Sequence, residues 1–265
     1  MKNATHTFTF LGTGAGCGVP AFFCSCAACE EARTVPLARR GCCGVLVEGQ
    51  KRLLIDTPPD LRHQLLRENI SSVDSLLFTH AHYDHVSGLG ELEYFVRLKR
   101  KSPLPLRGSA QALESINKEF GYLTECFSQT QIVAQESFSF DGITYTALPA
   151  THAPGTFGFL LESPNTSLFY ASDTGSLCEE TRERVMGVDI CVLDATFWKK
   201  SWMPESHFSA QEAIEEGLGM GVGTLYLTHL SMHYDEPITC AGLEDYLAQY
   251  DGQVKLAYDG LRLNL

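Results

Sequence analysis

The sequence has no long apolar run and comparatively little positive charge. No stretch approaches the roughly 18 consecutive apolar residues that a membrane-spanning helix needs, so we do not expect a membrane protein. Only 20 residues are lysine or arginine, against 32 aspartates and glutamates, and the formal net charge is −12. This balance argues against a nucleic-acid-binding surface. It does not argue against a small anionic substrate, because bound metal ions can supply positive charge.

The first residues also lack the features of an export signal. MKNATHTFTFLG has neither an apolar segment nor a small-residue cleavage site, so we expect a cytoplasmic protein. Cysteine, in contrast, is plentiful, with 10 residues. In a reducing compartment these thiols are expected to be metal ligands or small buried side chains rather than disulfides. No linker-like segment divides the chain, which predicts one domain over residues 1–265.

Short strands separated by turn residues dominate the pattern. Strands are predicted at residues 6–12, 44–56 (a hairpin), 75–80, 138–152 (a hairpin), 158–173 (a hairpin), 189–194, 223–229 and 254–260. Helices are predicted at residues 60–69, 90–99, 110–120 and 209–217, the last opened by the capping-box pattern SAQE. Hairpins followed by strands that alternate with helices indicate an α/β domain with mixed sheets.

Three of the nine histidines lie in one short stretch, THAHYDHVSG, residues 79–88. His80 and His82 are two residues apart, so they can point the same way from an extended segment. Asp84 and His85 can then turn toward a second ion. The alternative, a polar surface loop, would rarely produce this combination by chance.

Other potential ligands follow predicted strands in the same way. His152 follows YTALPAT, Asp173 follows LFYAS and His229 follows TLYLT. Strand ends in α/β folds are places where functional side chains converge on rigid supports. Together with the histidine-rich stretch they make five imidazoles and two carboxylates, which exceeds the about four ligands of one zinc ion. The set suits two ions roughly 3.5–4 Å apart that share one carboxylate.

A second candidate metal site lies near the N-terminus. FFCSCAACEE spaces Cys24, Cys26 and Cys29 as C-x-C-x2-C. Thiolates favour zinc, and a closed site of cysteines with one histidine is typical of structural zinc. The alternative is three buried thiols in a loop. The pattern therefore predicts a structural zinc knuckle near residues 24–29.

HAHYDH resembles the H-x-H-x-D-H signature of the metallo-β-lactamase superfamily, and the likeness extends from FLGTGAG to YDG near the end of the chain. The resemblance implies an αβ/βα sandwich of two mixed β-sheets flanked by helices. It also implies a ligand set, in which His80, His82 and His152 bind one ion, Asp84, His85 and His229 bind the second, and Asp173 bridges them. Asp56, at the end of LLID, matches an aspartate that orients the ligand loop.

The opening GTGAGCGVPAFFCSCAAC further resembles the PhnP-type cyclic phosphodiesterases. That resemblance implies a metal-dependent hydrolase of phosphoribosyl 1,2-cyclic phosphate that acts in phosphonate catabolism. It implies one structural zinc, two manganese ions at the active site and a homodimer. Mixed histidine and aspartate ligands also accept zinc or iron. Another small diester, such as a 2′,3′-cyclic nucleotide, is the other substrate that the sequence leaves open.

The chain departs from the family pattern at the expected fourth zinc ligand. The family has a histidine three residues after the last active-site histidine, where this chain has Met232. A thioether is a poor zinc ligand beside thiolates, so we expect His233 to close the site through a small local shift. In the same family pattern, His207 of PESHFSAQEA protonates or stabilises the leaving group. The alternative for both histidines is an ordinary polar role.

Two other functions are consistent with parts of the sequence. A tRNA 3′-processing endonuclease would share the ligand set, but such enzymes usually carry a basic, flexible arm, and the sequence shows none. A non-catalytic metal-binding scaffold, related to the pyrroloquinoline-quinone biosynthesis protein B group, would share the cysteine knuckle. That group tends to depart from the active-site ligand pattern, which is intact here.

Overall fold

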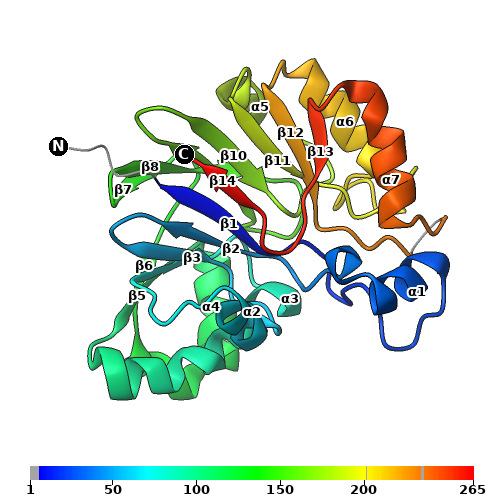
Figure 1. The fold of residues 1–265 in the computed structure, drawn as a ribbon. Coiled ribbons are helices and arrows are strands. Elements are labelled where there is room, and N and C mark those ends of the chain that lie inside the picture. The colour runs from blue at the N-terminus through cyan, green and yellow to red at the C-terminus, as the bar shows by residue number, and fades with distance from the viewer. Residues whose placement is uncertain (1–5, 201, 234–235) are drawn as a thin grey trace.

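Two seven-stranded sheets lie face to face, with helices on the outer side of each (Figure 1). The computed structural model describes residues 6–265 except 201 and 234–235. The first sheet has the order β14-β1-β2-β3-β4-β5-β6 and the second β13-β12-β11-β10-β9-β8-β7. Each sheet is antiparallel on one side and parallel on the other, the parallel parts being β3 to β6 and β10 to β13. This arrangement confirms the expected αβ/βα sandwich of mixed sheets.

The strand bounds are as follows: β1 Thr7–Gly12, β2 Gly44–Glu48, β3 Arg52–Ile55, β4 Ser75–Leu77, β5 Leu104–Gly108, β6 Phe127–Gln131, β7 Ser137–Phe140, β8 Ile143–Pro149, β9 Phe157–Glu162, β10 Ser167–Ala171, β11 Ile190–Asp194, β12 Thr224–Thr228, β13 Val254–Leu256 and β14 Arg262–Asn264. The helices are α1 Ala27–Thr34, α2 Leu61–Arg67, α3 Tyr83–Val86, α4 Ala110–Glu119, α5 Glu179–Val185, α6 Ala210–Gly219 and α7 Cys240–Leu247. None of the helices in the described part of the chain is long and apolar enough to cross a membrane.

Both faces of the central strands are apolar because both faces are covered. In β2, Val45 and Val47 point between the sheets, where they join Phe8, Phe10 and Tyr170. Leu46, between them in the chain, points to the opposite face and packs under the helices of the first sheet. Alternation of side chains along a strand therefore divides one apolar run between two cores.

Each set of helices closes one outer core. Leu61 of α2 and Leu113 of α4 pack on the first sheet, whereas Val185 of α5, Ile214 of α6 and Leu243 of α7 pack on the second. The predicted capping box at the start of α6 is present, with reciprocal hydrogen bonds between Ser209 and Glu212.

The helix predicted at residues 90–99 is present, but it is not a regular α-helix. The chain forms a 3-10 helix over Ser87–Leu92 and a π-helix over Phe95–Arg100. Gly88 lies so close to the backbone of Pro58 that a Cβ would clash with the Pro58 carbonyl oxygen. This close approach fixes the start of the segment, and Lys101 ends it in a left-handed conformation with φ 59°. The sequence also gave no prediction for β5, β6, β14, α1, α5 or α7.

Candidate metal centre

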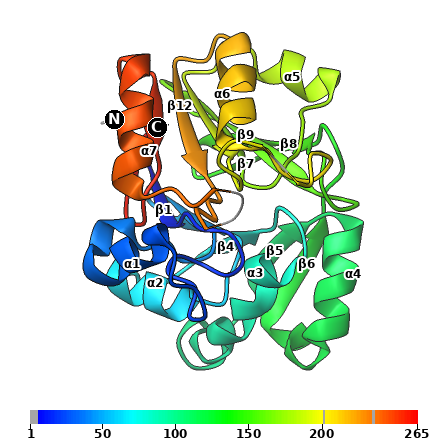
Figure 2. The ribbon, with the colours of Figure 1, turned by 90° about the vertical axis from the view of Figure 1, so that its right-hand side faces the viewer.

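The predicted ligands meet where strands of both sheets end. His80 lies beyond β4, His152 beyond β8, Asp173 beyond β10 and His229 directly after β12. Strands β10, β11 and β12 run parallel in register, with Ala171 opposite Leu193 and Asp194 opposite Thr228. Parallel strands place their carboxyl ends at one edge, so side chains distant in sequence converge there. Figure 2 shows α3, which carries Asp84 and His85, near the end of β12.

The ligand loop is held from below by Asp56. This fully buried carboxylate accepts hydrogen bonds from the Thr79 backbone N–H at 2.9 Å and the Thr79 hydroxyl at 2.8 Å. It also accepts from Nδ1 of His85 at 2.8 Å. That bond fixes the ring so that Nε2 of His85 faces Asp173, 3.2 Å from Oδ2. The arrangement is the one expected of an aspartate that orients a metal-binding histidine.

Two groups of side chains flank Asp173. The imidazole cluster consists of His80, His82 and His152, and the carboxylate cluster consists of Asp84, His85 and His229. Within each cluster the potential ligand atoms lie within 4.8 Å of one another. Asp173 lies between the clusters, with Oδ1 3.2 Å from Nε2 of His229 and 4.0 Å from Nε2 of His152.

Buried atoms at the centre fit a bound cation. Among the described residues, His80 Nε2, His85 Nε2 and Asp173 Oδ2 are buried and make no hydrogen bond. Nε2 of His85 and Oδ2 of Asp173 lie 3.2 Å apart as an ion pair, whereas His80 Nε2 has no such partner in the described part of the chain. Buried polar atoms are almost always hydrogen-bonded, so this arrangement needs an explanation. Metal ions coordinated by nitrogen and carboxylate oxygen would supply it, because these are the ligands that zinc and manganese accept.

The two clusters have opposite electrostatics without metal. Burial lowers the pKa of all three histidines of the imidazole cluster, which keeps them neutral. In the carboxylate cluster, burial would lower the pKa of His85, but Asp173 and Asp84 raise it well above its usual range. Burial would lower the pKa of His229 too, but Asp173, together with Asp84 and Asp194, raises it to about 9. Metal ions would bind the neutral imidazoles directly and would displace protons from the carboxylate cluster.

His207 lies beside this group and is paired with an aspartate that sequence reasoning missed. Nδ1 of His207 donates to Oδ2 of Asp194 at 2.7 Å. Asp194 is fully buried and also accepts from the backbone N–H groups of Thr174 and Thr196. The His207 ring stacks parallel to that of His229, with centroids 5.3 Å apart. Asp194 ends the strand sequence DICVLD, as Asp56 ends LLID, and that repeated pattern is the signal that could have identified it.

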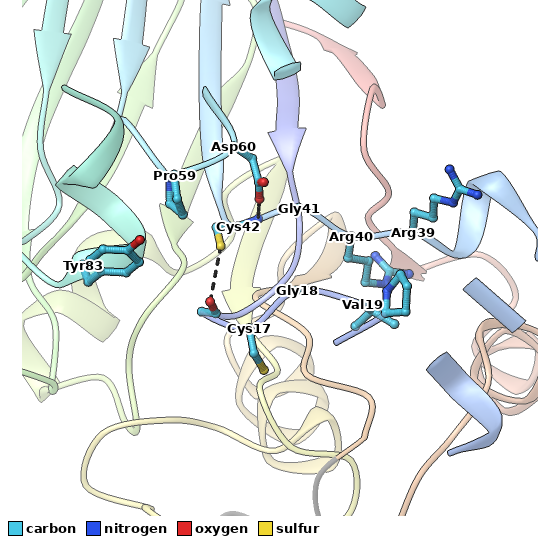
Figure 3. Close-up of a pocket in the computed structure, with 12 residues that line it drawn as sticks. Cys17, Gly18, Val19, Arg39, Arg40, Gly41, Cys42, Pro59, Asp60 and Tyr83 are labelled. Atoms are coloured by element: carbon cyan, nitrogen blue, oxygen red, sulfur yellow. Dashed lines mark hydrogen bonds between the residues drawn. The ribbon is translucent and has the colours of Figure 1, made fainter. Parts of the chain in front are cut away.

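A cavity of about 470 Å³ opens over the metal ligands. It is lined by Asp84, Asp173, His82 and His229, by His207, by the turn at residues 15–17 and by Phe197, Trp202 and Met203. A second cavity of about 380 Å³ shares Gly16 and Cys17 with the first and continues past Asp60 to Tyr83 (Figure 3). The turn at residues 15–17 therefore separates two neighbouring hollows.

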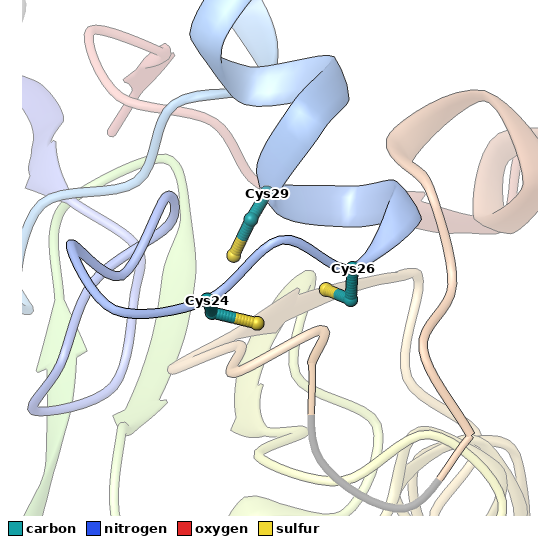
Figure 4. Close-up of side chains that lie close together, drawn as sticks. All are labelled: Cys24, Cys26 and Cys29. Atoms are coloured by element: carbon teal, nitrogen blue, oxygen red, sulfur yellow. The ribbon is translucent and has the colours of Figure 1, made fainter.

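The cysteine knuckle lies next to α1. The Sγ atoms of Cys24, Cys26 and Cys29 lie within 4.8 Å of one another and point into a common space (Figure 4). Burial raises the pKa of Cys29 to about 12, so without a metal ion this side chain is a neutral thiol. All ten cysteines are free, as expected for a chain that does not use disulfides.

His233, rather than Met232, faces the knuckle. Nδ1 of His233 lies 3.7 Å from Sγ of Cys29, and Nε2 lies 3.1 Å from Sγ of Cys17. Met232 adopts a left-handed backbone conformation with φ 58°, and its sulfur accepts a hydrogen bond from the buried Arg40. The backbone therefore turns Met232 inward and brings His233 to the cysteines.

Comparisons with known proteins agree with this geometry. A family model described as beta-lactamase superfamily domain matches residues 51–230. A crystal structure of a diphosphatase from the PhnP family is 29% identical, with a TM-score of 0.86 over 98% of this chain and 97% of that chain. Zinc-bound PqqB from Methylobacterium extorquens shares the fold at 19% identity, with a TM-score of 0.81 over 98% of this chain and 100% of that one.

A longer relative matches over one part of its length. An octanoyltransferase from Porphyromonas gingivalis is 25% identical over 260 residues, which are 95% of this chain and 50% of that protein. The chain thus spans half the length of this relative.

Proposed function

The chain belongs to the β-lactamase superfamily, and on that premise we propose that it is a two-metal phosphodiesterase that hydrolyses a small phosphate diester. The observation that carries this proposal is the place of Asp173 between the imidazole and carboxylate clusters, with buried nitrogen atoms on both sides that make no hydrogen bond among the described residues. The likeness to a PhnP-family diphosphatase supports chemistry at phosphorus.

The residues divide between two divalent ions, manganese, zinc or iron. The imidazole cluster would hold one, the carboxylate cluster the other, and Asp173 would contact both. Such ions, when bound, supply a nucleophile from water near neutral pH and neutralise charge on the phosphoryl oxygens. Asp56 keeps His85 oriented toward this position. One structural zinc, held by Cys24, Cys26, Cys29 and His233, completes the proposed metal content.

His207 is placed to complete the reaction as a general acid. Asp194 accepts the Nδ1 proton and so fixes the ring, which lines the cavity beside the metal ligands. Nε2 is then the atom from which a protonated His207 can give a proton to the departing alkoxide.

The leading substrates are phosphoribosyl 1,2-cyclic phosphate and a 2′,3′-cyclic nucleotide. The first follows from the PhnP likeness and would place the protein in phosphonate catabolism. The second needs the same cleavage of a strained five-membered diester. We would measure kcat/KM for both with manganese supplied and after removal of metal. Hydrolysis that disappears with the metal supports the proposal, and absence of turnover of either diester with metal present contradicts it.

The role of His207 has a sharper test. In His207→Ala, hydrolysis of esters with poor leaving groups should fall by about 10²-fold or more, because the alkoxide must leave without a proton. Nitrophenyl esters should be affected much less, because nitrophenolate departs unprotonated. His63→Ala, an exposed histidine of α2, is the matched control. An equal loss on both ester types would contradict the acid role.

A metal-binding role without turnover is the second candidate, and the fold shared with zinc-bound PqqB favours it. The ligand set argues for catalysis, since a scaffold needs neither the bridging position of Asp173 nor the Asp194–His207 pair. Metal-dependent turnover of any phosphate diester decides between the two.

A further inference from the structure

The cavity over the metal centre has an aromatic wall that the proposed chemistry does not use. The rings of Phe197 and Trp202 have centroids 5.2 Å apart and planes inclined by 37°. Phe197 is only 4% exposed, whereas Trp202 is 60% exposed. Phe197 also lies edge-on to His207, with ring centroids 6.3 Å apart. The wall therefore begins beside the candidate acid and reaches outward to solvent.

The wall and the acid are carried by the same segment, which joins β11 to α6. The Phe197 N–H group donates to the Phe208 carbonyl oxygen, and the Ala210 N–H group donates to the Phe197 carbonyl oxygen. These two backbone hydrogen bonds fix Phe197. Trp202 and His207 both follow Phe197 in this segment and line the same cavity. A flat group bound against Trp202 would therefore lie in the same cavity as His207.

The charge of the cavity limits what the rest of the substrate can be. Among the described residues that line it, none is lysine or arginine. The neighbouring cavity has two arginines, but Arg40 is buried and bonded to Thr13 and to the Ala257 carbonyl oxygen. Arg39 donates to carbonyl oxygens of the α1 segment and points away from the shared turn (Figure 3). Among the described residues that line the two cavities, no lysine lies ready to bind a second phosphate group, such as the 5-phosphate of a phosphoribosyl ring, and both arginines are engaged as above.

We propose that Trp202, backed by the buried Phe197, forms a stacking platform for a nucleobase, so that the substrate is a phosphate diester of a nucleoside. This inference rests on the proposed function and chooses between its two leading substrates. Bases stack on aromatic side chains irrespective of sequence, and Trp offers the largest flat surface. The cavity volume of about 470 Å³ lies within the usual range for small-molecule sites.

The test compares two substrates that differ only in the base. These are 2′,3′-cyclic AMP and ribose 2,3-cyclic phosphate, which has the same reactive ring without adenine. In Trp202→Ala, KM for 2′,3′-cyclic AMP should rise roughly tenfold or more with little change in kcat, and the constants for ribose 2,3-cyclic phosphate should not change. Trp202→Phe should retain most of the wild-type KM. The matched control is Trp198→Phe, because Trp198 packs on Tyr246 rather than in the cavity.

A binding measurement separates this inference from the proposed function. In the Trp198→Phe protein, Trp202 is the single tryptophan, so its fluorescence reports on the wall directly. Adenosine 3′-phosphate should quench it, and ribose 3-phosphate should not. Two outcomes would overturn the platform and leave the proposed phosphodiesterase function intact. In one, the protein hydrolyses diesters but Trp202→Ala does not change its base preference. In the other, the protein prefers phosphoribosyl 1,2-cyclic phosphate. Without diester turnover, quenching would still support the platform, and its absence would overturn both.

Discussion

The metal centre and the cysteine knuckle are built in opposite ways. The centre takes its side chains from the ends of four strands, between residues 80 and 229. Asp56 and Asp194 hold the rings of His85 and His207 in place through hydrogen bonds. The knuckle takes its three cysteines from residues 24–29, on one loop and the start of α1, and His233 is its proposed fourth ligand. That loop is held by Arg33, which donates to the carbonyl oxygens of Cys24 and Ala21.

Because of this difference, a metal ion would have a different role at each site. At the centre, sheet and core position the ligands before any ion binds, so the ion is needed for chemistry rather than for the fold. At the knuckle, few hydrogen bonds hold a partly exposed loop, so the ion would contribute directly to folding. The contrast therefore predicts that variants at the metal centre lose activity while the fold stays stable. Variants at the knuckle should lose stability before they lose activity.

The largest effect on activity is expected for Asp173→Asn. The amide cannot carry the negative charge shared by both clusters, so diester hydrolysis should fall on the order of 10³-fold. The melting temperature of the protein should change little, because the strands still hold the fold. Asp245→Asn, an exposed aspartate of α7, serves as control. Activity within tenfold of wild type would remove Asp173 from the centre of the mechanism.

The opposite outcome is expected at the knuckle for Cys29→Ser. Loss of a thiolate should empty the zinc site and lower the free energy of unfolding by about 3 kcal/mol in zinc-containing buffer. Activity with manganese should fall much less than in Asp173→Asn. Zinc content and urea unfolding measure both effects. Cys178→Ser, at an exposed cysteine, should change neither, and full zinc content in Cys29→Ser would show that the knuckle is not the zinc site.

A smaller effect should follow when the support of the centre is weakened. In Asp56→Asn the carboxylate that accepts from both Thr79 and His85 becomes an amide, so the His85 ring is less well oriented. We expect a 10- to 100-fold loss of manganese affinity. Competition with a chelator measures it. Unchanged affinity would mean that the strand ends alone orient the ligands.

A still smaller effect distinguishes the two candidate closing residues of the knuckle. His233→Ala should lose part of its zinc and roughly half the stability that Cys29→Ser loses, because three thiolates alone hold the ion less tightly than the complete ligand set. Met232→Leu should retain zinc, since its side chain contacts Arg40 instead. Equal zinc retention in both variants would show that His233 is not a ligand.

The sequence predicted this molecule best where the local pattern and the final geometry coincide. His80, His82, Asp84 and His85 share one short motif, and the remote ligands each follow a recognisable strand. The pairing of Asp194 with His207 depends on the segment between β11 and α6 folding back, which no local pattern shows. The wall of Phe197 and Trp202 depends on the same fold-back.

Two other outcomes have specific physical causes. The helix predicted at residues 90–99 forms, but as 3-10 and π-helical turns that sequence periodicity does not distinguish from an α-helix, and it ends at the left-handed Lys101. The shift from Met232 to His233 could be expected from zinc chemistry. Its cause, a left-handed residue that turns Met232 toward Arg40, is visible only in three dimensions.

The last prediction concerns the protons that the imidazole and carboxylate clusters bind, because the two clusters differ in protonation. In the metal-free protein the raised pKa of His229, about 9 against 6.5, means that its charged form stabilises the fold fully below pH 6.5, and that this contribution is lost as pH rises through about 9. The pKa of His85 is raised in the same direction. Manganese must displace both protons, whereas the imidazole cluster is already neutral.

Manganese uptake at pH 7.5 should therefore release about two protons per chain. Calorimetry in two buffers of different ionisation enthalpy measures that number. In Asp173→Asn the release should fall, because Asp173 is the main cause of the raised pKa at both histidines. Binding heats that do not depend on the buffer would mean that the carboxylate cluster is neutral before metal binds. The imidazole and carboxylate clusters would then carry the same charge, and the only remaining difference would be the one between the metal centre and the knuckle.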